Sequence, residues 1–260
     1  MNNVFRRLLR LACALALLVP LVCRAAAPDP AVARGKKVLL VFNSTKLERT
    51  RAAQPADPVR LGKLEAQRAS DLKLAAFLES LGFTVTRADE TSPLSAAEDK
   101  DLVVISETVD ALDIAAKYRH LAVPLIDCEN DLLGDLGMTG QKSSRDYGTE
   151  EEQRFVWIVN SPHPLAAGLA AGVQNVLTDE HCKMNWGKPG LGAVTIATLR
   201  GEPDKAAIFA YEKGATMNWE FLAPARRVSF FLWSDTFTQL RPEGLALFRA
   251  AVLWAATKPD

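Results

Sequence analysis

Three short, continuous apolar runs dominate the first half of the chain. They lie at residues 36–43, 101–106 and 123–128, and polar residues bound each of them. A strand that is buried on both faces has a continuous apolar sequence. A strand with one solvent-exposed face instead alternates between apolar and polar residues. Residues 83–86 do alternate between polar and apolar positions. We expect all four segments to be strands, with the three apolar runs in the middle of a sheet.

Helical patterns separate these predicted strands. Residues 63–81 carry apolar side chains at helical spacing and end at Gly82, and residues 108–121 read as a second helix. The polar stretch 44–62, with Pro55 and Pro58, predicts a long loop. Alternation of strands and helices requires parallel strands with right-handed crossovers. The pattern therefore predicts an α/β fold, namely a flavodoxin-like, doubly wound, mostly parallel sheet with helices on both faces.

The second half of the chain is richer in strands. Strand-like patterns occupy residues 154–159, 174–177, 194–199, 206–211 and 227–233. Residues 201–204, Gly-Glu-Pro-Asp, read as a turn, which predicts an added antiparallel hairpin. An apolar helix over residues 243–256 closes the chain. No linker interrupts the pattern, so we expect a single domain over residues 36–258.

The N-terminus has the pattern of a signal peptide over residues 1–27. Arg6, Arg7 and Arg10 precede an apolar stretch, and small residues offer cleavage sites after Ala25 or Ala27. An uncleaved membrane anchor is the alternative, although the apolar stretch is short for a bilayer. We expect a periplasmic or extracellular protein with no membrane association after cleavage.

Charge excludes some partners. The 260 residues include 31 basic and 31 acidic ones, and removal of residues 1–27 leaves a net charge of about −4. Nucleic acid is an unsuitable partner because phosphate binding needs clustered cations, which this chain lacks. Cys128 and Cys182 remain after cleavage, and they could form a disulfide or stay as buried free thiols. The oligomeric state is not predicted by any pattern in the chain.

Cys128 is the candidate nucleophile, because it ends a buried strand where α/β folds place their chemistry. Its neighbours oppose that role. No glycine lies within five residues of it, whereas a nucleophile on a sharp turn usually has flanking glycines. Asp127 and Glu129 are adjacent, and negative charges raise the pKa of a thiol.

A nucleophilic thiol also needs a base, and the chain has only three histidines. His120 ends a predicted helix, and His163 lies in a turn between two prolines. His181 is the one histidine that we consider as a partner for Cys128 or Glu129. Asn43, Ser106 and Glu107 follow predicted strands, and we expect them at the same edge as His163, Asp179 and Glu180.

The sequence contains no motif that would predict a metal, nucleotide or cofactor site. Asp179, Glu180, His181 and Cys182 match no metal-ligand spacing, even with Glu129 added. No glycine-rich phosphate loop occurs, so we expect no cofactor. Trp186 lies among turn residues, where it could stack on a sugar or complete the core.

Two segments resemble class I glutamine amidotransferase-like domains. Residues 123–128, Val-Pro-Leu-Ile-Asp-Cys, are similar to the nucleophile strand of that superfamily, P-V-x-G-x-C-x-G. Residues 228–248 resemble its last strand and helix, in which F-H-P-E supplies the catalytic His and Glu. Here the corresponding stretch is Phe-Phe-Leu-Trp-Ser-Asp, and Trp233 or Ser234 stands near the place of the histidine.

Within that superfamily the chain most resembles ThuA-like domains, named for trehalose utilisation. Residues 160–169 are similar to their H-P-(I/L)-x-x-G-L turn, and residues 178–180 resemble the D-E that follows it. The resemblance spans residues 36–256 and implies a flavodoxin-like sheet without the amidotransferase triad. We therefore expect an exported, catalytically degenerate domain with a binding or accessory role, with a small-molecule carbohydrate as the partner to test. The alternative is a hydrolase or isomerase that uses Cys128 or Glu129 with His181.

Overall fold

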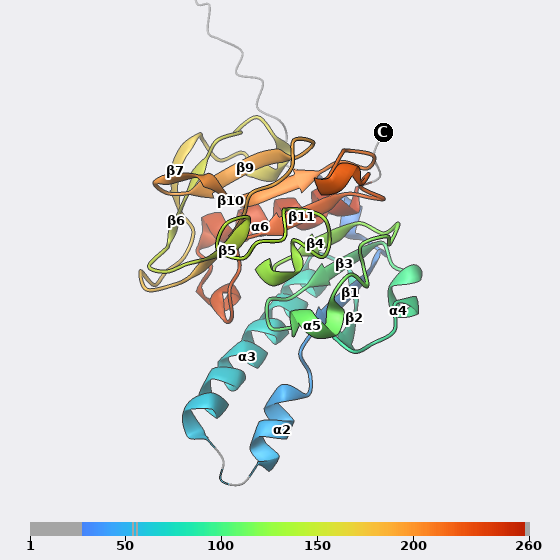
Figure 1. Cartoon of the computed structure of the whole chain (residues 1–260), viewed down its shortest axis with the longest axis vertical. Coiled ribbons are helices and arrows are strands. Elements are labelled where there is room, and N and C mark those ends of the chain that lie inside the picture. The colour runs from blue at the N-terminus through green and yellow to red at the C-terminus, as the bar shows by residue number, and fades with distance from the viewer. Residues whose placement is uncertain (1–27, 54, 56, 258–260) are drawn as a thin grey trace, which may run out of the picture.

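The computed structural model describes residues 28–53, 55 and 57–257. The predicted signal peptide lies outside these residues. Within them the strands form one eleven-stranded mixed sheet that runs through the whole molecule (Figure 1). None of the helices in this part of the chain has the length and apolar character needed to cross a bilayer.

Five parallel strands make one half of the sheet. They lie side by side in the order β2-β1-β3-β4-β11. Their bounds are Lys37–Phe42 for β1, Thr84–Asp89 for β2, Leu102–Ile105 for β3, Leu125–Asp127 for β4 and Arg227–Phe230 for β11. The three predicted apolar runs are thus central strands, fully covered on both faces as their composition indicates.

The other half of the sheet is antiparallel and larger than the predicted hairpin. It continues from β11 in the order β10-β9-β6-β7, and β8 pairs with both β10 and β5. The bounds are Tyr147–Glu150 for β5, Phe155–Ile158 for β6, Gly172–Asn175 for β7, Met184–Gly187 for β8, Val194–Leu199 for β9 and Glu202–Tyr211 for β10. The β9–β10 hairpin confirms the predicted hairpin, but its turn lies at residues 200–201, with Gly201 at φ +82°, and residues 202–204 of the predicted turn begin β10.

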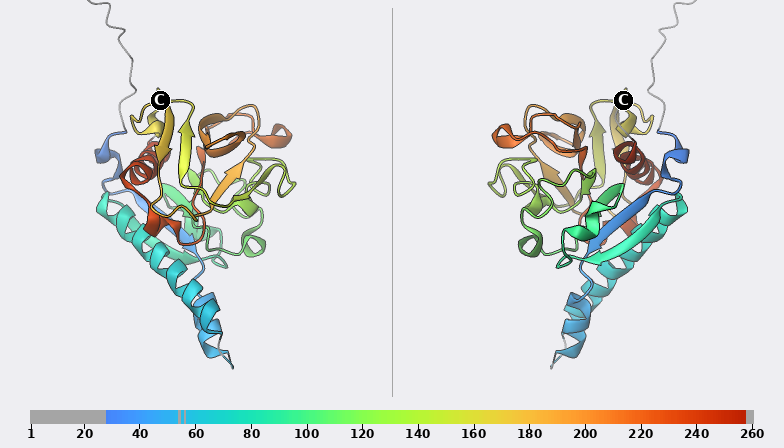
Figure 2. Two further views of the ribbon diagram at one scale, coloured as in Figure 1. Left: turned by 90° about the vertical axis from the view of Figure 1, so that its left-hand side faces the viewer. Right: turned by 90° about the vertical axis from the view of Figure 1, so that its right-hand side faces the viewer.

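Helices cover both faces of the parallel half. The long helix α3, Pro58–Ser80, and the last helix α6, Pro242–Ala256, pack on one face, and Figure 2 shows them on the same side of the sheet. The short helices α4, Ser95–Glu98, and α5, Ala111–Ile114, pack on the other face. Helix α2, Lys46–Ala52, lies beside the start of α3, and both project beyond the body. Five short 3₁₀ helices complete the fold: Pro30–Ala33, Asn130–Leu132, Pro164–Ala166, Asn218–Glu220 and Thr236–Gln239.

Two predicted elements were wrong. The predicted loop 44–62 contains α2 and the first turn of α3, because Pro58 occupies the first helical position and Asp57 caps the helix by accepting from the N–H groups of Val59 and Arg60. The predicted helix 108–121 is helical only in α5, since Ala115 takes a positive φ of 43° and ends it.

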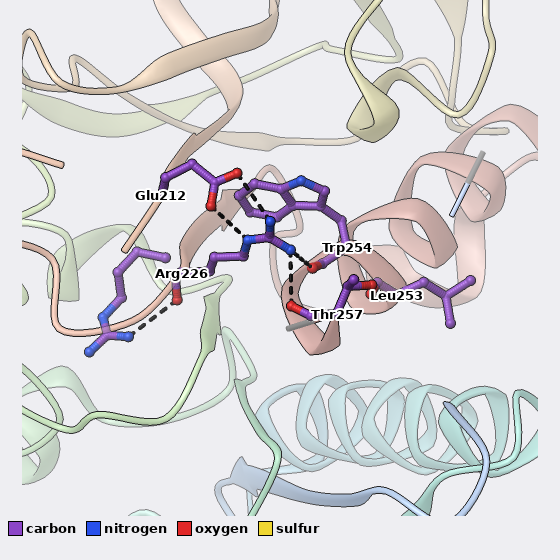
Figure 3. Close-up of polar contacts among 6 residues, drawn as sticks. Glu212, Arg226, Leu253, Trp254 and Thr257 are labelled. Carbon is purple, nitrogen blue, oxygen red and sulfur yellow. Dashed lines mark hydrogen bonds and ion pairs between the residues drawn. The ribbon is translucent and has the colours of Figure 1, made fainter. Parts of the chain in front are cut away.

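Arg226 directly precedes β11, at the amino-terminal ends of the parallel strands, which we call the amino edge. Its side chain binds the end of α6 there (Figure 3). Its guanidinium donates to both carboxylate oxygens of Glu212, at 2.7 and 3.2 Å, and to the carbonyls of Trp254 and Thr257, at 2.6 and 3.0 Å. It also stacks on the Trp254 ring, 4.2 Å from the centroid. A cation here satisfies orphan carbonyls and complements the negative end of the helix.

Candidate functional site

The carboxyl ends of β1, β3, β4 and β11 meet at one edge of the sheet, because these strands are parallel neighbours. Asn43 follows β1, Ser106 and Glu107 follow β3, and Cys128 and Glu129 follow β4. The structure thus brings these five predicted residues to one edge. We call it the carboxyl edge below.

Cys128 is sealed within this edge. Only 2% of the residue is exposed, and it belongs to the core cluster beneath α3 and α6. Burial raises the pKa of its thiol well above the ordinary value, and the carboxyls of Asp127, Glu107, Glu129 and Asp71 raise it further. The thiol therefore stays protonated near neutral pH, and a protonated thiol is a poor nucleophile.

Two glutamates, the partly buried Glu107 and the buried Glu129, lie near enough to Cys128 for their charges to affect it. Burial raises the pKa of Glu107 to about 8, although the Ser234 N–H donates to its Oε2 at 2.5 Å and the Lys63 charge opposes the rise. Burial, and next the charge of Glu107, raise the pKa of Glu129 well above its ordinary range. The raised pKa values favour the protonated form of both carboxyls, and a protonated carboxyl can donate a hydrogen bond or a proton.

Asp71, on α3, is a site residue that the sequence did not reveal. It is 3% exposed and accepts hydrogen bonds from Ser106 Oγ at 2.5 Å and Thr108 Oγ1 at 2.8 Å. Burial raises its pKa to about 6, against the effect of these two hydroxyl donors. The only signal in the sequence is a carboxylate at a position of α3 that otherwise falls on its apolar stripe.

Asn185, on β8, closes the edge from the antiparallel half. Its side-chain amide donates to the carbonyls of Cys128 at 2.9 Å and Leu232 at 2.8 Å, and its Oδ1 accepts from Thr149 at 2.8 Å. One buried side chain therefore joins β4, the end of β11 and β5. Sequence reasoning missed it because β8 was interpreted as a turn.

Trp233 and Ser234 cover the carboxyl edge from the end of β11. The Trp233 ring lies between two ammonium groups, with Lys63 at 5.5 Å and Lys183 at 5.1 Å from its centroid. Ser234 has a left-handed φ of 51°, and its hydroxyl accepts from Gln67 on α3 at 3.1 Å. Backbone strain of this kind persists only where the surroundings hold it.

A small void lies on the α3 side of the carboxyl edge. A void of about 10 Å³ lies between α3 and the ends of β1 and β3, enough for about one water molecule. It is lined by Asn43, Lys46, Leu47, Leu64, Gln67, Arg68, Asp71 and Thr108.

Comparison with known proteins gives the fold. No protein-family model matches the sequence, and no curated protein matches it. A ThuA-like protein from Bacteroides uniformis superposes with a TM-score of 0.50 at 11% identity, over 86% of this chain and 92% of that one. The chain has a ThuA-like fold.

Two other solved structures share less of the geometry. A GMP synthase-like protein from Thermoplasma acidophilum gives a TM-score of 0.45 at 12% identity, over 85% of this chain and 94% of that one. The N-terminal domain of mmIFT52 gives 0.44 at 10% identity, over 86% and 99%. At these identities the ThuA-like fold is what the comparisons establish.

Within the described residues of this ThuA-like fold, no hydrogen bond joins a histidine imidazole to the Cys128 sulfur. His181 is exposed and lines a surface hollow beside β6. The His163 ring packs 5.6 Å from that of Trp254, at the amino edge where Arg226 binds α6. The structure therefore places His163 at the amino-terminal ends of the parallel strands. It places His181 at the surface, two residues from Lys183, whose ammonium lies 5.1 Å from the Trp233 ring centroid.

The remaining predicted residues have local structural contacts. Asn43 donates to Glu90 Oε1 at 2.6 Å and accepts from the Lys46 N–H at 2.7 Å, which starts α2. Asp179 accepts from the His181 N–H at 2.9 Å, and Glu180 pairs loosely with Arg154 at 3.7 Å. Trp186 is 4% exposed, so its ring is not available to stack on a ligand.

The two cysteines of the domain are free and buried, so the disulfide alternative is not realised. Burial raises the pKa of Cys182 to about 11. In residues 28–53, 55 and 57–257, no three His, Cys, Asp or Glu side chains converge as metal ligands.

Proposed function

We propose that this protein is an exported, catalytically degenerate amidotransferase-like domain with a binding or accessory role in carbohydrate metabolism. We also propose that its parallel half is flavodoxin-like. Numbered along the chain, the parallel strands follow the order 2-1-3-4-5, which is the flavodoxin-like order.

One observation carries the proposal of degeneracy, namely the state of Cys128. The thiol is sealed in the core, and the surrounding carboxyls disfavour its ionisation. Amidotransferase chemistry needs a thiolate and an imidazole base within hydrogen-bond reach. The Trp233–Ser234 turn occupies the end of β11, where a related enzyme would carry its base.

Among the described residues no hydrogen bond supports the pair of Cys128 or Glu129 with His181, and Cys128 and Glu129 are buried whereas His181 is exposed. Binding is the role that remains compatible with a sealed edge. A binding protein needs only complementary surface, whereas a hydrolase needs substrate to reach the nucleophile.

The degeneracy is tested by a glutaminase assay on the chain without residues 1–27, with Cys128→Ala as the matched variant. We expect no ammonia release from glutamine above the blank for either protein. Turnover by the parent chain that Cys128→Ala abolishes would refute the proposal, because it would show a working thiolate.

The binding role is tested by a thermal-shift screen against neutral and acidic mono- and oligosaccharides. A ligand that binds only the folded state raises the melting temperature by mass action. A flat response to every saccharide contradicts the carbohydrate role. Export is tested separately, by N-terminal sequencing of the protein from the periplasm or medium, which should begin at Ala26 or Pro28.

A further inference from the structure

The antiparallel half presents an exposed aromatic surface that the carboxyl edge does not use. Trp157 on β6 is 47% exposed, and its cross-strand neighbour on β7, Val173, is 43% exposed. The strand β7 ends the sheet, so this surface lies at its outer margin, far from α2 and α3 (Figures 1 and 2). Trp157 and Val173 thus place two exposed apolar side chains side by side on one face of the sheet.

A hollow of about 580 Å³ adjoins this surface. Phe155, two residues before Trp157 on the same strand, forms part of its wall, so the two side chains share one face of the strand and their Cα atoms are about 7 Å apart. The other side chains that matter are Arg154, Arg200 and His181, with Glu152 and Glu180 at the rim. The size is that of a site for a small ligand.

The two arginines are held on the Phe155 ring. The guanidinium carbons of Arg154 and Arg200 each lie 5.0 Å from its centroid. Arg154 has one distant partner, Glu180 at 3.7 Å, and Arg200 forms no side-chain ion pair or hydrogen bond with any described residue. Stacking orients a guanidinium fork that would otherwise be flexible, and its donors stay open to a ligand.

We infer that this hollow and the adjoining Trp157 form a binding site for an acidic saccharide. The ligand carboxylate accepts from the Arg200 and Arg154 forks, and the flat C–H face of a sugar ring stacks on Trp157. The rim carboxylates of Glu152 and Glu180 accept from sugar hydroxyls. The inference rests on the proposed carbohydrate-binding role and specifies its site and ligand class.

The test is isothermal titration calorimetry of the chain without residues 1–27 with trigalacturonic acid, and with maltotriose as a neutral probe of equal length. Arg200→Ala and Trp157→Ala are the test variants. The matched controls are Arg60→Ala, an exposed arginine on α3, and Trp219→Ala, a tryptophan that is 56% exposed elsewhere. Circular dichroism of each variant checks that it is folded.

We expect trigalacturonic acid to bind at least about tenfold more tightly than maltotriose, because a charge-assisted bidentate hydrogen bond contributes about that much. Arg200→Ala should weaken binding about tenfold and Trp157→Ala severalfold, whereas the controls should change it less than about twofold. Arg200→Lys should restore only part of the affinity, because an ammonium cannot form the fork.

Three results would overturn the inference, and they differ in what they say about the proposed function. Binding of maltotriose but not of trigalacturonic acid rejects the acidic ligand and keeps the carbohydrate role. Binding of trigalacturonic acid that neither test variant weakens moves the site elsewhere. Absence of binding to both probes, together with a flat thermal-shift screen, rejects the site and the carbohydrate role together.

Discussion

Asp71 should lower the stability of this protein as pH rises, and the substitution Asp71→Asn should remove that part of the pH dependence. Burial raises the pKa of its carboxyl from 3.8 to about 6. A carboxyl with a raised folded-state pKa binds more protons in the folded than in the unfolded state between those two values. Its contribution to stability is therefore complete at pH below 3.8 and is lost as pH rises through about 6.

The magnitude follows from the two pKa values. Each unit corresponds to about 1.4 kcal/mol, so the full loss is about 3 kcal/mol, of which about 2 kcal/mol falls between about pH 4 and about pH 7. Asp71→Asn mimics the protonated acid in size and hydrogen bonding. Because hydroxyls both donate and accept, the Ser106 and Thr108 side chains can turn to satisfy the amide.

The assay is urea unfolding at several pH values, for the parent chain and for Asp71→Asn. The free energy of unfolding of the parent chain should fall relative to that of the variant by about 2 kcal/mol across this window. Asp204→Asn, an exposed carboxylate on β10, is the matched control and should run parallel to the parent chain. Parallel curves for Asp71→Asn as well would refute the reasoning, because they would mean that Asp71 ionises as freely as in water.

Three other expectations concern packing. In native protein near neutral pH, neither Cys128 nor Cys182 should react with Ellman's reagent, whereas both should react in denaturant. Rapid labelling of Cys128 in the native protein would contradict its burial at the carboxyl edge. Asn185→Ala should lower the free energy of unfolding, measured in urea, by about 2–3 kcal/mol, because the buried carbonyls of Cys128 and Leu232 lose their donor. A loss below about 0.5 kcal/mol would argue against these two hydrogen bonds. Gly62→Ala should raise the melting temperature, because alanine favours a helix and nothing in α3 or around it obstructs the added Cβ. Gly192→Ala should lower the melting temperature, because its Cβ would clash with the backbone oxygen of Thr216. Equal shifts in the two melting temperatures would contradict this difference in the space around the two glycines.

The parallel half of the fold could be predicted because its signals are local. Buried parallel strands are continuous apolar runs, and the helix between β1 and β2 shows its period in the sequence. The strands β5 and β8 could not be predicted in this way. Each contains a glycine, Gly148 or Gly187, which weakens a strand pattern, although these glycines are needed where Trp186 and Phe209 approach the backbone.

The carboxyl edge was only partly predictable for a related reason. Asn43, Ser106, Glu107, Cys128 and Glu129 directly follow strands, so strand order alone brings them together. Asp71 and Asn185 reach the same edge from the middle of a helix and from a strand of the other half, through long-range packing. Loops such as that of His181 lack any periodicity that would predict which surface they join.

Helix α3 makes the carboxyl edge part of a large cooperative unit. The same rigid helix of 23 residues, about 35 Å long, carries Lys63, Gln67 and Asp71 to the edge and Leu74 and Leu78 to the core. A loop lid could open at little cost, but exposure of Cys128 here requires α3 to leave its core contacts. Amide hydrogens around the edge should therefore exchange only through sub-global unfolding, as slowly as those of the central strands.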